Sequence, residues 1–176
     1  MNIDDLKQKI RNIPNFPKPG IVFRDITTLL DDVEAFRKVI DIYADHFQDK
    51  NINKIVAIES RGFIFGGALA YKMDAAFVPV RKLGKLPGET IKKEYELEYG
   101  VDALEMHRDA IRAGDNVLIV DDLMATGGTL AATCGMVEKL GANIAGIAVL
   151  IELSFLKGQD KFQKYDYLPL IKYDSE

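Results

Sequence analysis

Four short segments of the chain are mostly apolar and rich in β-branched residues: 54–58, 76–80, 116–120 and 143–150. Apolar and polar positions do not alternate along them, as they would in a strand with one face in water. Such runs are typical of strands that are buried on both faces, which is the situation in parallel sheets. The pattern therefore predicts a central, mostly parallel β-sheet.

Segments with helical periodicity lie between these runs. Residues 33–47 carry apolar side chains every three or four positions, and 62–72 and 128–140 are two further helical candidates. Asp31 and Asp32 are placed to cap the first helix. Because strands alternating with helices indicate βαβ units, the expected fold class is α/β, with an open, mostly parallel sheet flanked by helices.

Two segments interrupt this alternation. Residues 14–24 contain three of the chain's six prolines, so they cannot form a helix and are expected to pack as an ordered arm. Residues 81–107 are long for a connection inside a compact domain, and such loops usually serve a function. From Glu94 to Tyr99, glutamates alternate with tyrosine and leucine. This predicts a β-hairpin flap with its glutamates on one face, which turns back at residues 100–102.

Length and composition indicate one domain, residues 1–176, in which 1–30 form an N-terminal arm and hood and 81–107 the flap. Of its 176 residues, 48% are hydrophobic and 28% are charged, which is typical of a single globular domain. No apolar run is long enough to span a membrane, and the polar start is unlike a signal peptide. We therefore expect a cytoplasmic protein without a membrane partner.

Charge and cysteine content exclude several kinds of site. The net charge of −4 argues against a nucleic acid held by bulk positive charge. The single cysteine, Cys134, excludes an internal disulfide and any multi-cysteine metal site. His46 and His107 lie far apart and match no zinc-binding spacing.

The most specific motif is VLIVDDLMATGGT at residues 117–129. A buried strand ends in Asp121 and Asp122, and a turn of small residues then opens a helix. This turn has two glycines, free amides at a helix N-terminus and two threonine hydroxyls, which together suit a phosphate monoester. It comprises Ala125, Thr126, Gly127, Gly128 and Thr129. Ligands of open α/β sheets bind beyond the carboxyl ends of the strands. If the turn holds the phosphate of a sugar phosphate, the two aspartates, which come just before the turn, lie where the sugar hydroxyls would be.

The alternative interpretation of this motif is structural: the two glycines form a tight turn between strand and helix, and an aspartate caps the helix. A nucleoside triphosphate or dinucleotide site is not expected, because neither GxxxxGK[ST] nor GxGxxG occurs in the chain.

Three further segments carry candidate chemistry. Residues 81–93 hold five basic side chains against one glutamate, so they could clamp a pyrophosphate, although a solvated loop would look similar. Residues 59–62 (ESRG) end a predicted strand and open a helix, so their amides and Arg61 could also grip phosphate; the alternative is a helix capped by Ser60. Residues 21–24 (IVFR) offer an apolar wall, an aromatic ring and backbone amides, or they pack as part of the core.

Together these segments resemble the type I phosphoribosyltransferases, and in particular the members of that family that act on adenine. The resemblance runs from the N-terminal arm to about Tyr173. It is carried by the motif at 117–129, FPKPGIVFRD at 16–25, ESRGF at 59–63, RKLGKLPG at 81–88 and LEYG at 97–100. The resemblance implies the type I fold, with a flap over the active site. It also implies transfer of the 5-phosphoribosyl group from phosphoribosyl pyrophosphate to adenine, which yields AMP and pyrophosphate, with Mg²⁺ held mainly by the substrate, in a homodimer.

The resemblance also assigns roles to individual residues. Glu98 is the implied catalytic group, which exchanges a proton with adenine or stabilises the cationic transition state, and Tyr99 helps to order the closed flap. The implied adenine contacts are Val22, Phe23, Arg24 and Leu123. The implied contacts of the 5′-phosphate are Ala125, Thr126, Gly127, Gly128 and Thr129. The implied contacts of the ribose are Asp121 and Asp122. The implied pyrophosphate contacts are Glu59, Ser60, Arg61, Arg81, Lys82 and Lys85, with a cis peptide bond between Glu59 and Ser60.

Three rival functions remain at this point. The first is a related transferase for guanine, hypoxanthine or xanthine, against which the KLPGE and LEYG segments argue. The second is a non-catalytic regulator that senses phosphoribosyl pyrophosphate and binds nucleic acid; neither the length nor the charge of the chain favours it. The third is a nucleotide-binding module without catalysis, which Glu98 and the basic loop make less plausible.

Overall fold

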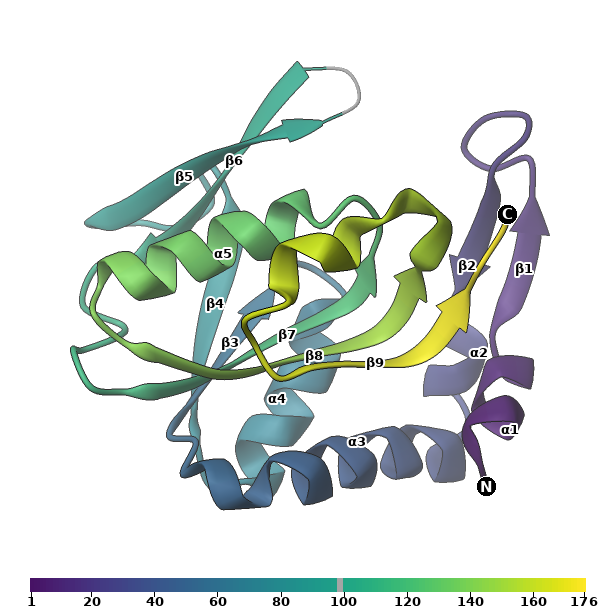
Figure 1. Cartoon of the computed structure of the whole chain (residues 1–176), viewed down its shortest axis with the longest axis horizontal. Coiled ribbons are helices and arrows are strands. Elements are labelled where there is room, and N and C mark those ends of the chain that lie inside the picture. Colours follow the sequence, from purple (N-terminus) through teal and green to yellow (C-terminus); the bar gives the residue numbers. More distant parts are fainter. Residues whose placement is uncertain (98–99) are drawn as a thin grey trace.

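The central element is a seven-stranded sheet with the strand order β5-β6-β4-β3-β7-β8-β9 (Figure 1). The computed structural model describes residues 1–97 and 100–176. The five strands from β4 to β9 in this order pair in parallel, and β5 and β6 add an antiparallel hairpin at the edge. The strands are β3 (Lys54–Ile58), β4 (Ala76–Lys82), β5 (Thr90–Leu97), β6 (Gly100–His107), β7 (Asn116–Met124), β8 (Asn143–Leu153) and β9 (Tyr167–Tyr173). The predicted parallel sheet and hairpin are confirmed.

Helices cover both faces of the sheet. α3 (Val33–Phe47) and α4 (Gly62–Lys72) lie on one face and α5 (Gly128–Lys139) lies on the other (Figure 1). Residues along β7 alternate between two apolar clusters: Leu118 and Val120 pack with α3 and α4, whereas Val117 and Ile119 pack with α5. β7 is thus buried on both sides, which explains its almost continuous apolar sequence.

The N-terminal arm is ordered, as predicted, and contains two short strands. After α1 (Ile3–Gln8), β1 (Arg11–Pro14) pairs antiparallel with β2 (Val22–Asp25), and α2 (Thr27–Leu30) follows. The arm stands beside the C-terminal end of β9 (Figure 1), where the Arg24 guanidinium lies 3.9 Å from the centre of the Tyr173 ring. This contact ties the arm to the main sheet.

Several predicted details were wrong. β6 begins at Gly100, so residues 100–102 belong to the strand and do not form the predicted turn. Asp31 does not cap α3; the Asp32 carboxylate alone accepts the amide protons of Glu34 and Ala35. The helix predicted at 128–140 ends at Lys139. β7 continues to Met124 because Asp121 and Leu123 still pair with β8, which the two acidic residues concealed in the sequence.

The described residues also form three short 3₁₀ helices: η1 (Gln48–Lys50), η2 (Ser154–Leu156) and η3 (Gly158–Phe162). Among the described residues, no helix combines the length and the apolar character that crossing a bilayer would require.

Candidate functional site

The carboxyl ends of β3, β4 and β7 meet at one edge of the sheet. Ile58 pairs with Val80, and Ala57 pairs with Val120. Continuing this register, Asp121 is level with Ile58, and Glu59 is level with Arg81 and Asp122. The ends of the strands therefore place the predicted pyrophosphate and ribose residues in one row. Ligands of open α/β sheets bind at such an edge.

The predicted phosphate turn, residues 125–129, connects β7 to α5. Gly127 occupies the N-cap position of α5 with φ +78°, a left-handed conformation that favours glycine. No side chain caps this helix, so the first amides of α5 have no acceptor within it. Free amides and the positive end of the helix dipole together form an anion-binding arrangement.

Asp121 and Asp122 are both about nine-tenths buried, with relative exposures of 7%. The backbone N–H of Asp122 donates to Asp121 Oδ1 (2.9 Å), and Arg61 Nε lies 2.7 Å from Asp122 Oδ2. Burial raises the pKa of both carboxyls. The Asp122 charge adds to this effect at Asp121, whereas Arg61 opposes it at Asp122. Two buried acids with one guanidinium suit a ligand that offers hydroxyl groups.

Glu59 contacts the basic residues at the end of β4. Its carboxylate accepts the backbone N–H of Lys82 (2.7 Å) and Arg81 Nε (2.9 Å), and Lys85 Nζ lies 3.4 Å away. Burial alone would raise the pKa of Glu59, but the hydrogen bonds from Lys82 and Arg81 outweigh burial and lower it. Glu59 is therefore placed to orient the cations, and its own negative charge makes it a poor partner for pyrophosphate.

The peptide bond between Glu59 and Ser60 is cis, as the resemblance implies. The alternative in which Ser60 caps α4 is wrong: Arg61 holds the N-cap position and no side-chain cap is present.

Two acidic residues of β6 also shape the basic loop, and the sequence analysis missed both. Glu105 is 2% exposed and accepts the backbone N–H groups of Lys85 and Leu86, each at 2.9 Å. Asp102 lies 3.4 Å from Lys82 Nζ. The available signal was a glutamate within an otherwise apolar run, residues 103–106, because a charge buried among apolar neighbours needs partners.

The residues predicted to bind the base lie on β2 and near the end of β7. Phe23 extends toward the acidic pair, since the Arg61 guanidinium lies 5.3 Å from the centre of its ring. Leu123 is half-buried and packs against the cluster formed by α3 and α4. Arg61 thus joins the predicted base side to the predicted ribose side.

The backbone at the predicted base site also contacts the last residues of the sequence. Glu176 Oε2 accepts the Val22 N–H at 2.9 Å. Arg24 is buried, and its Nη1 donates to Asn12 Oδ1 at 2.7 Å. These contacts hold β2 in place.

Glu98 and Tyr99, the predicted catalytic and flap residues, lie outside the described residues. Nearby in the hairpin, the Tyr95 hydroxyl donates to Asp102 Oδ2 at 3.1 Å. The hairpin that carries the LEYG segment projects from the edge of the sheet next to β4 (Figure 1).

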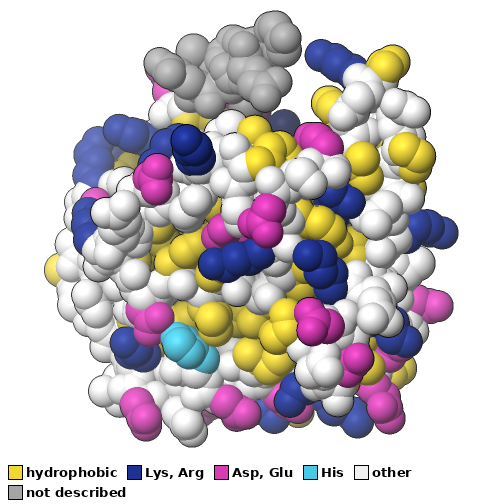
Figure 2. Space-filling view, turned by 45° about the vertical axis from the view of Figure 1, so that its right-hand side comes forward, with side chains coloured by type: hydrophobic (Ala, Val, Ile, Leu, Met, Phe, Trp, Pro, Cys, Tyr) yellow, Lys and Arg dark blue, Asp and Glu magenta, His cyan; other side chains and the backbone are white. Residues whose placement is uncertain are grey.

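Charges of both signs lie side by side around the site. Arg61 pairs with Asp122 and Arg81 pairs with Glu59. On the face shown in Figure 2, acidic and basic side chains are likewise adjacent. Within residues 1–97 and 100–176, no three His, Cys, Asp or Glu side chains converge to hold a metal ion.

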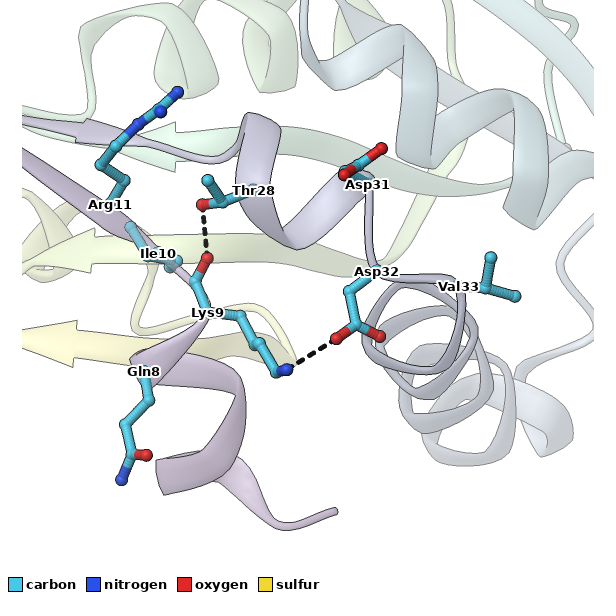
Figure 3. Close-up of a pocket in the computed structure, with 8 residues that line it drawn as sticks. All are labelled: Gln8, Lys9, Ile10, Arg11, Thr28, Asp31, Asp32 and Val33. Carbon is cyan, nitrogen blue, oxygen red and sulfur yellow. Dashed lines mark hydrogen bonds and ion pairs between the residues drawn. The ribbon is translucent and has the colours of Figure 1, made fainter.

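A separate pocket lies where α1 and β1 meet the connection from α2 to α3 (Figure 3). Several of its polar groups pair with one another: Lys9 Nζ lies 2.7 Å from Asp32 Oδ2, and the Thr28 hydroxyl donates to the Lys9 carbonyl at 2.6 Å. It shares no residue with the strand ends, so we do not assign the site to it.

Comparison with known proteins places the chain among phosphoribosyltransferases. Residues 25–172 match the family model described as "Phosphoribosyl transferase domain". The adenine phosphoribosyltransferase of Clostridium perfringens is 56% identical over 169 residues, which is 96% of this chain and 98% of that protein.

Solved structures agree with this comparison. The crystal structure of adenine phosphoribosyltransferase from Thermoanaerobacter pseudethanolicus superposes with a TM-score of 0.93 at 50% identity, covering 98% of this chain and 100% of that one. The Saccharomyces cerevisiae enzyme, complexed with an imino-altritol bisphosphate and adenine, gives a TM-score of 0.90 at 44% identity, covering 96% of this chain and 97% of that one.

Proposed function

Because this chain belongs to the phosphoribosyltransferase family, we propose that it transfers the 5-phosphoribosyl group from phosphoribosyl pyrophosphate to adenine. The products are AMP and pyrophosphate. Relatives that share half or more of their residues with nearly the whole chain are adenine phosphoribosyltransferases. The observation that carries the proposal is the row of acidic and basic residues at the ends of β3, β4 and β7, directly beside the anion-binding turn before α5.

A panel of bases tests this function. The purified protein is incubated with phosphoribosyl pyrophosphate and Mg²⁺, and adenine, guanine, hypoxanthine and xanthine are offered separately while nucleotide and pyrophosphate are measured. We expect AMP from adenine and no nucleotide from the three oxopurines. Activity with an oxopurine would overturn the assignment of the base. Binding of phosphoribosyl pyrophosphate without any product would favour a regulator.

In the proposed mechanism, the protein holds two reactants in line and excludes water. The turn 125–129 binds the 5′-phosphate, Asp121 and Asp122 hold the ribose hydroxyls, and Phe23 stacks on adenine. Arg81 and Lys85 bind pyrophosphate. Departure of pyrophosphate leaves a sugar with oxocarbenium character, as in glycoside cleavage. The adenine nitrogen then forms the new bond to the anomeric carbon, and Glu98 accepts its proton.

The flap has two tasks in this mechanism. It carries Glu98 to the base, and it closes over the sugar cation, which water would otherwise capture. Tyr99 helps to order the closed flap.

We also propose that the reaction depends on Mg²⁺ that enters with the substrate. Bound to pyrophosphate, Mg²⁺ would neutralise the charge of the leaving group. The substrate oxygens would hold most of this Mg²⁺, because hard cations prefer oxygen ligands. Asp121 and Asp122 would anchor the ribose hydroxyls and would not form a protein cage around the metal.

Chelation of Mg²⁺ is expected to separate activity from stability. Excess EDTA should lower the rate of AMP formation on the order of a hundredfold, because a metal contributes several kcal/mol to such a transition state. The midpoint of thermal unfolding should not change, since the proposed metal belongs to the substrate. The two measurements are a product assay and differential scanning fluorimetry in the same buffer. A fall in the unfolding midpoint would reveal a structural metal and contradict the proposal.

A homodimer is the proposed assembly, and the outer face of α4 supports it. Ile64 and Tyr71, seven residues apart, share this face and are 42% and 92% exposed. Phe77 on β4 is 39% exposed and contacts Phe63, which lies at the beginning of α4. Large apolar side chains grouped in this way are typical of a contact surface.

We also keep the predicted cytoplasmic location as part of the proposal.

Ile64→Asp is expected to weaken this dimer. A buried carboxylate without a partner should raise the dimer dissociation constant roughly a hundredfold. Sedimentation velocity over a range of concentrations measures the change. Val33→Asp is the matched control, because Val33 is 67% exposed at the start of α3 and outside the proposed contact surface. A wild-type monomer, or equal weakening by both variants, would contradict the assignment of α4.

A further inference from the structure

The phosphate turn is supported from behind by η3, a segment that follows it by about thirty residues in the sequence. Gly158 makes the contact. A Cβ atom at this position would lie 2.5 Å from the Ala125 carbonyl oxygen and 2.8 Å from the Thr126 carbonyl carbon. Only a residue without a side chain allows η3 to reach the turn so closely. In Figure 1, η2 and η3 are the yellow-green helical turns between β8 and β9, and they lie next to the beginning of α5.

Lys161 in η3 forms a specific hydrogen bond with this turn. Its Nζ donates to the carbonyl oxygen of Thr126 at 2.7 Å. The cis peptide bonds found in the described chain, Phe16–Pro17 and Glu59–Ser60, lie elsewhere. In a trans peptide unit the C=O and N–H groups point in opposite directions. Since Lys161 fixes the Thr126 carbonyl, it also directs the Gly127 N–H away from η3.

The same contact changes the electrostatics of the turn. An ammonium that binds a carbonyl oxygen polarises the peptide unit, which makes its N–H a stronger donor. It also places a positive charge behind a turn whose proposed ligand is a phosphate monoester. Phe162 packs against the turn at Gly127. It is 1% exposed, and its ring lies within 3.1 Å of the position that a Gly127 Cβ would take.

We propose that Lys161 is a positioning residue for the 5′-phosphate subsite. It holds the peptide between Thr126 and Gly127 so that the amide faces the phosphate, and Gly158 permits the approach that this contact needs. The inference rests on one part of the proposed function, namely that the turn binds the phosphate of a phosphorylated ribose.

A control residue lies just beyond the end of η3. Lys164 lies three positions after Lys161, is exposed, and pairs with Glu138 at 2.7 Å through Nζ. Replacing it removes one positive charge from the region without removing the bond to the turn.

The test compares Lys161→Gln, Lys161→Arg and Lys164→Gln with wild type. Lys161→Gln should raise KM for phosphoribosyl pyrophosphate roughly tenfold, which is the size expected for one charged hydrogen bond. KM for adenine and kcat should stay within about twofold, because a uniform binding contribution changes KM and not kcat. Lys161→Arg should recover most of the loss, and Lys164→Gln should match wild type. Calorimetry with ribose 5-phosphate should show the same tenfold weakening, whereas the Kd of pyrophosphate should not change.

The possible outcomes are distinct. Unchanged affinity of Lys161→Gln for ribose 5-phosphate, or equal weakening of pyrophosphate binding, would overturn the proposal. An equal loss in Lys164→Gln would show a general effect of charge and would also overturn it. Failure of wild type to make AMP would refute the proposed function alone, because weaker binding of ribose 5-phosphate by Lys161→Gln would still support the subsite.

Discussion

Asp121→Asn is expected to yield a protein that is more stable than wild type and roughly a hundredfold less active. Activity falls because the ribose hydroxyls lose a charged hydrogen-bond partner, worth about 1.5–3 kcal/mol. Stability rises because the substitution removes one of two adjacent buried carboxylates, while the amide oxygen can still accept the Asp122 N–H. A gain on the order of 1 kcal/mol corresponds to roughly 2–4 °C in a chain of this length.

The pH dependence of stability gives this prediction a second readout. Burial, followed by the Asp122 charge, raises the pKa of Asp121 above its ordinary value of 3.8. A carboxyl with a raised pKa in the folded state binds its proton more tightly there than in the unfolded chain. The stability that this contributes is present at low pH and is lost as pH rises from the unfolded towards the folded pKa. The advantage of Asp121→Asn should therefore be small near about pH 4 and grow with rising pH.

Thermal unfolding from acidic to neutral pH, together with steady-state kinetics, measures both effects. Asp109→Asn is the matched control, because Asp109 is exposed and its replacement should change neither quantity. An Asp121→Asn protein that is less stable than wild type at neutral pH would show that the carboxylate stabilises the fold. Wild-type kinetics would exclude Asp121 from the ribose site.

Glu98→Gln is expected to lower kcat by roughly a hundredfold or more, which is the usual contribution of a general acid or base. Glutamine keeps the size of the side chain and its carbonyl oxygen, but it neither accepts the proton of adenine nor carries a negative charge opposite the sugar cation. KM for phosphoribosyl pyrophosphate should change little, because this residue is proposed to act on the base.

Glu94→Gln is the control for this variant. Glu94 is an exposed glutamate of the same hairpin, on β5, so the substitution makes the same change in charge without touching the proposed catalytic position. A single-turnover measurement separates chemistry from flap movement and product release. If Glu98→Gln forms AMP at the wild-type single-turnover rate, the catalytic role of Glu98 is wrong.

The regular part of the fold could be predicted from local pattern. The sequence predicted β3, α3 and α4 with the ends found in the structure. Their signals are local: continuous apolar runs for buried strands and apolar residues every three or four positions for helices. β9 was not predicted, since Pro169 lies within it and a proline weakens a strand pattern. α1 is only six residues long and has one buried side chain, Leu6, so its apolar periodicity is weak.

Some parts of the candidate site could also be predicted from local pattern, and others could not. The sequence by itself determined that the proposed phosphate turn adjoins the acidic pair, because both lie within thirteen consecutive residues at the junction of a buried strand and a helix. Local order along the chain is enough to bring these groups together.

Only the tertiary structure decided which charges meet. Glu59 contacts Arg81 across 22 residues, and Lys161 contacts Thr126 across 35. The positions of these partners depend on strand order, on register and on the close approach that Gly158 allows. A sequence pattern shows that a lysine or a glutamate is present, but the energy of an ion pair depends on distance and burial, and the packing of distant segments fixes both.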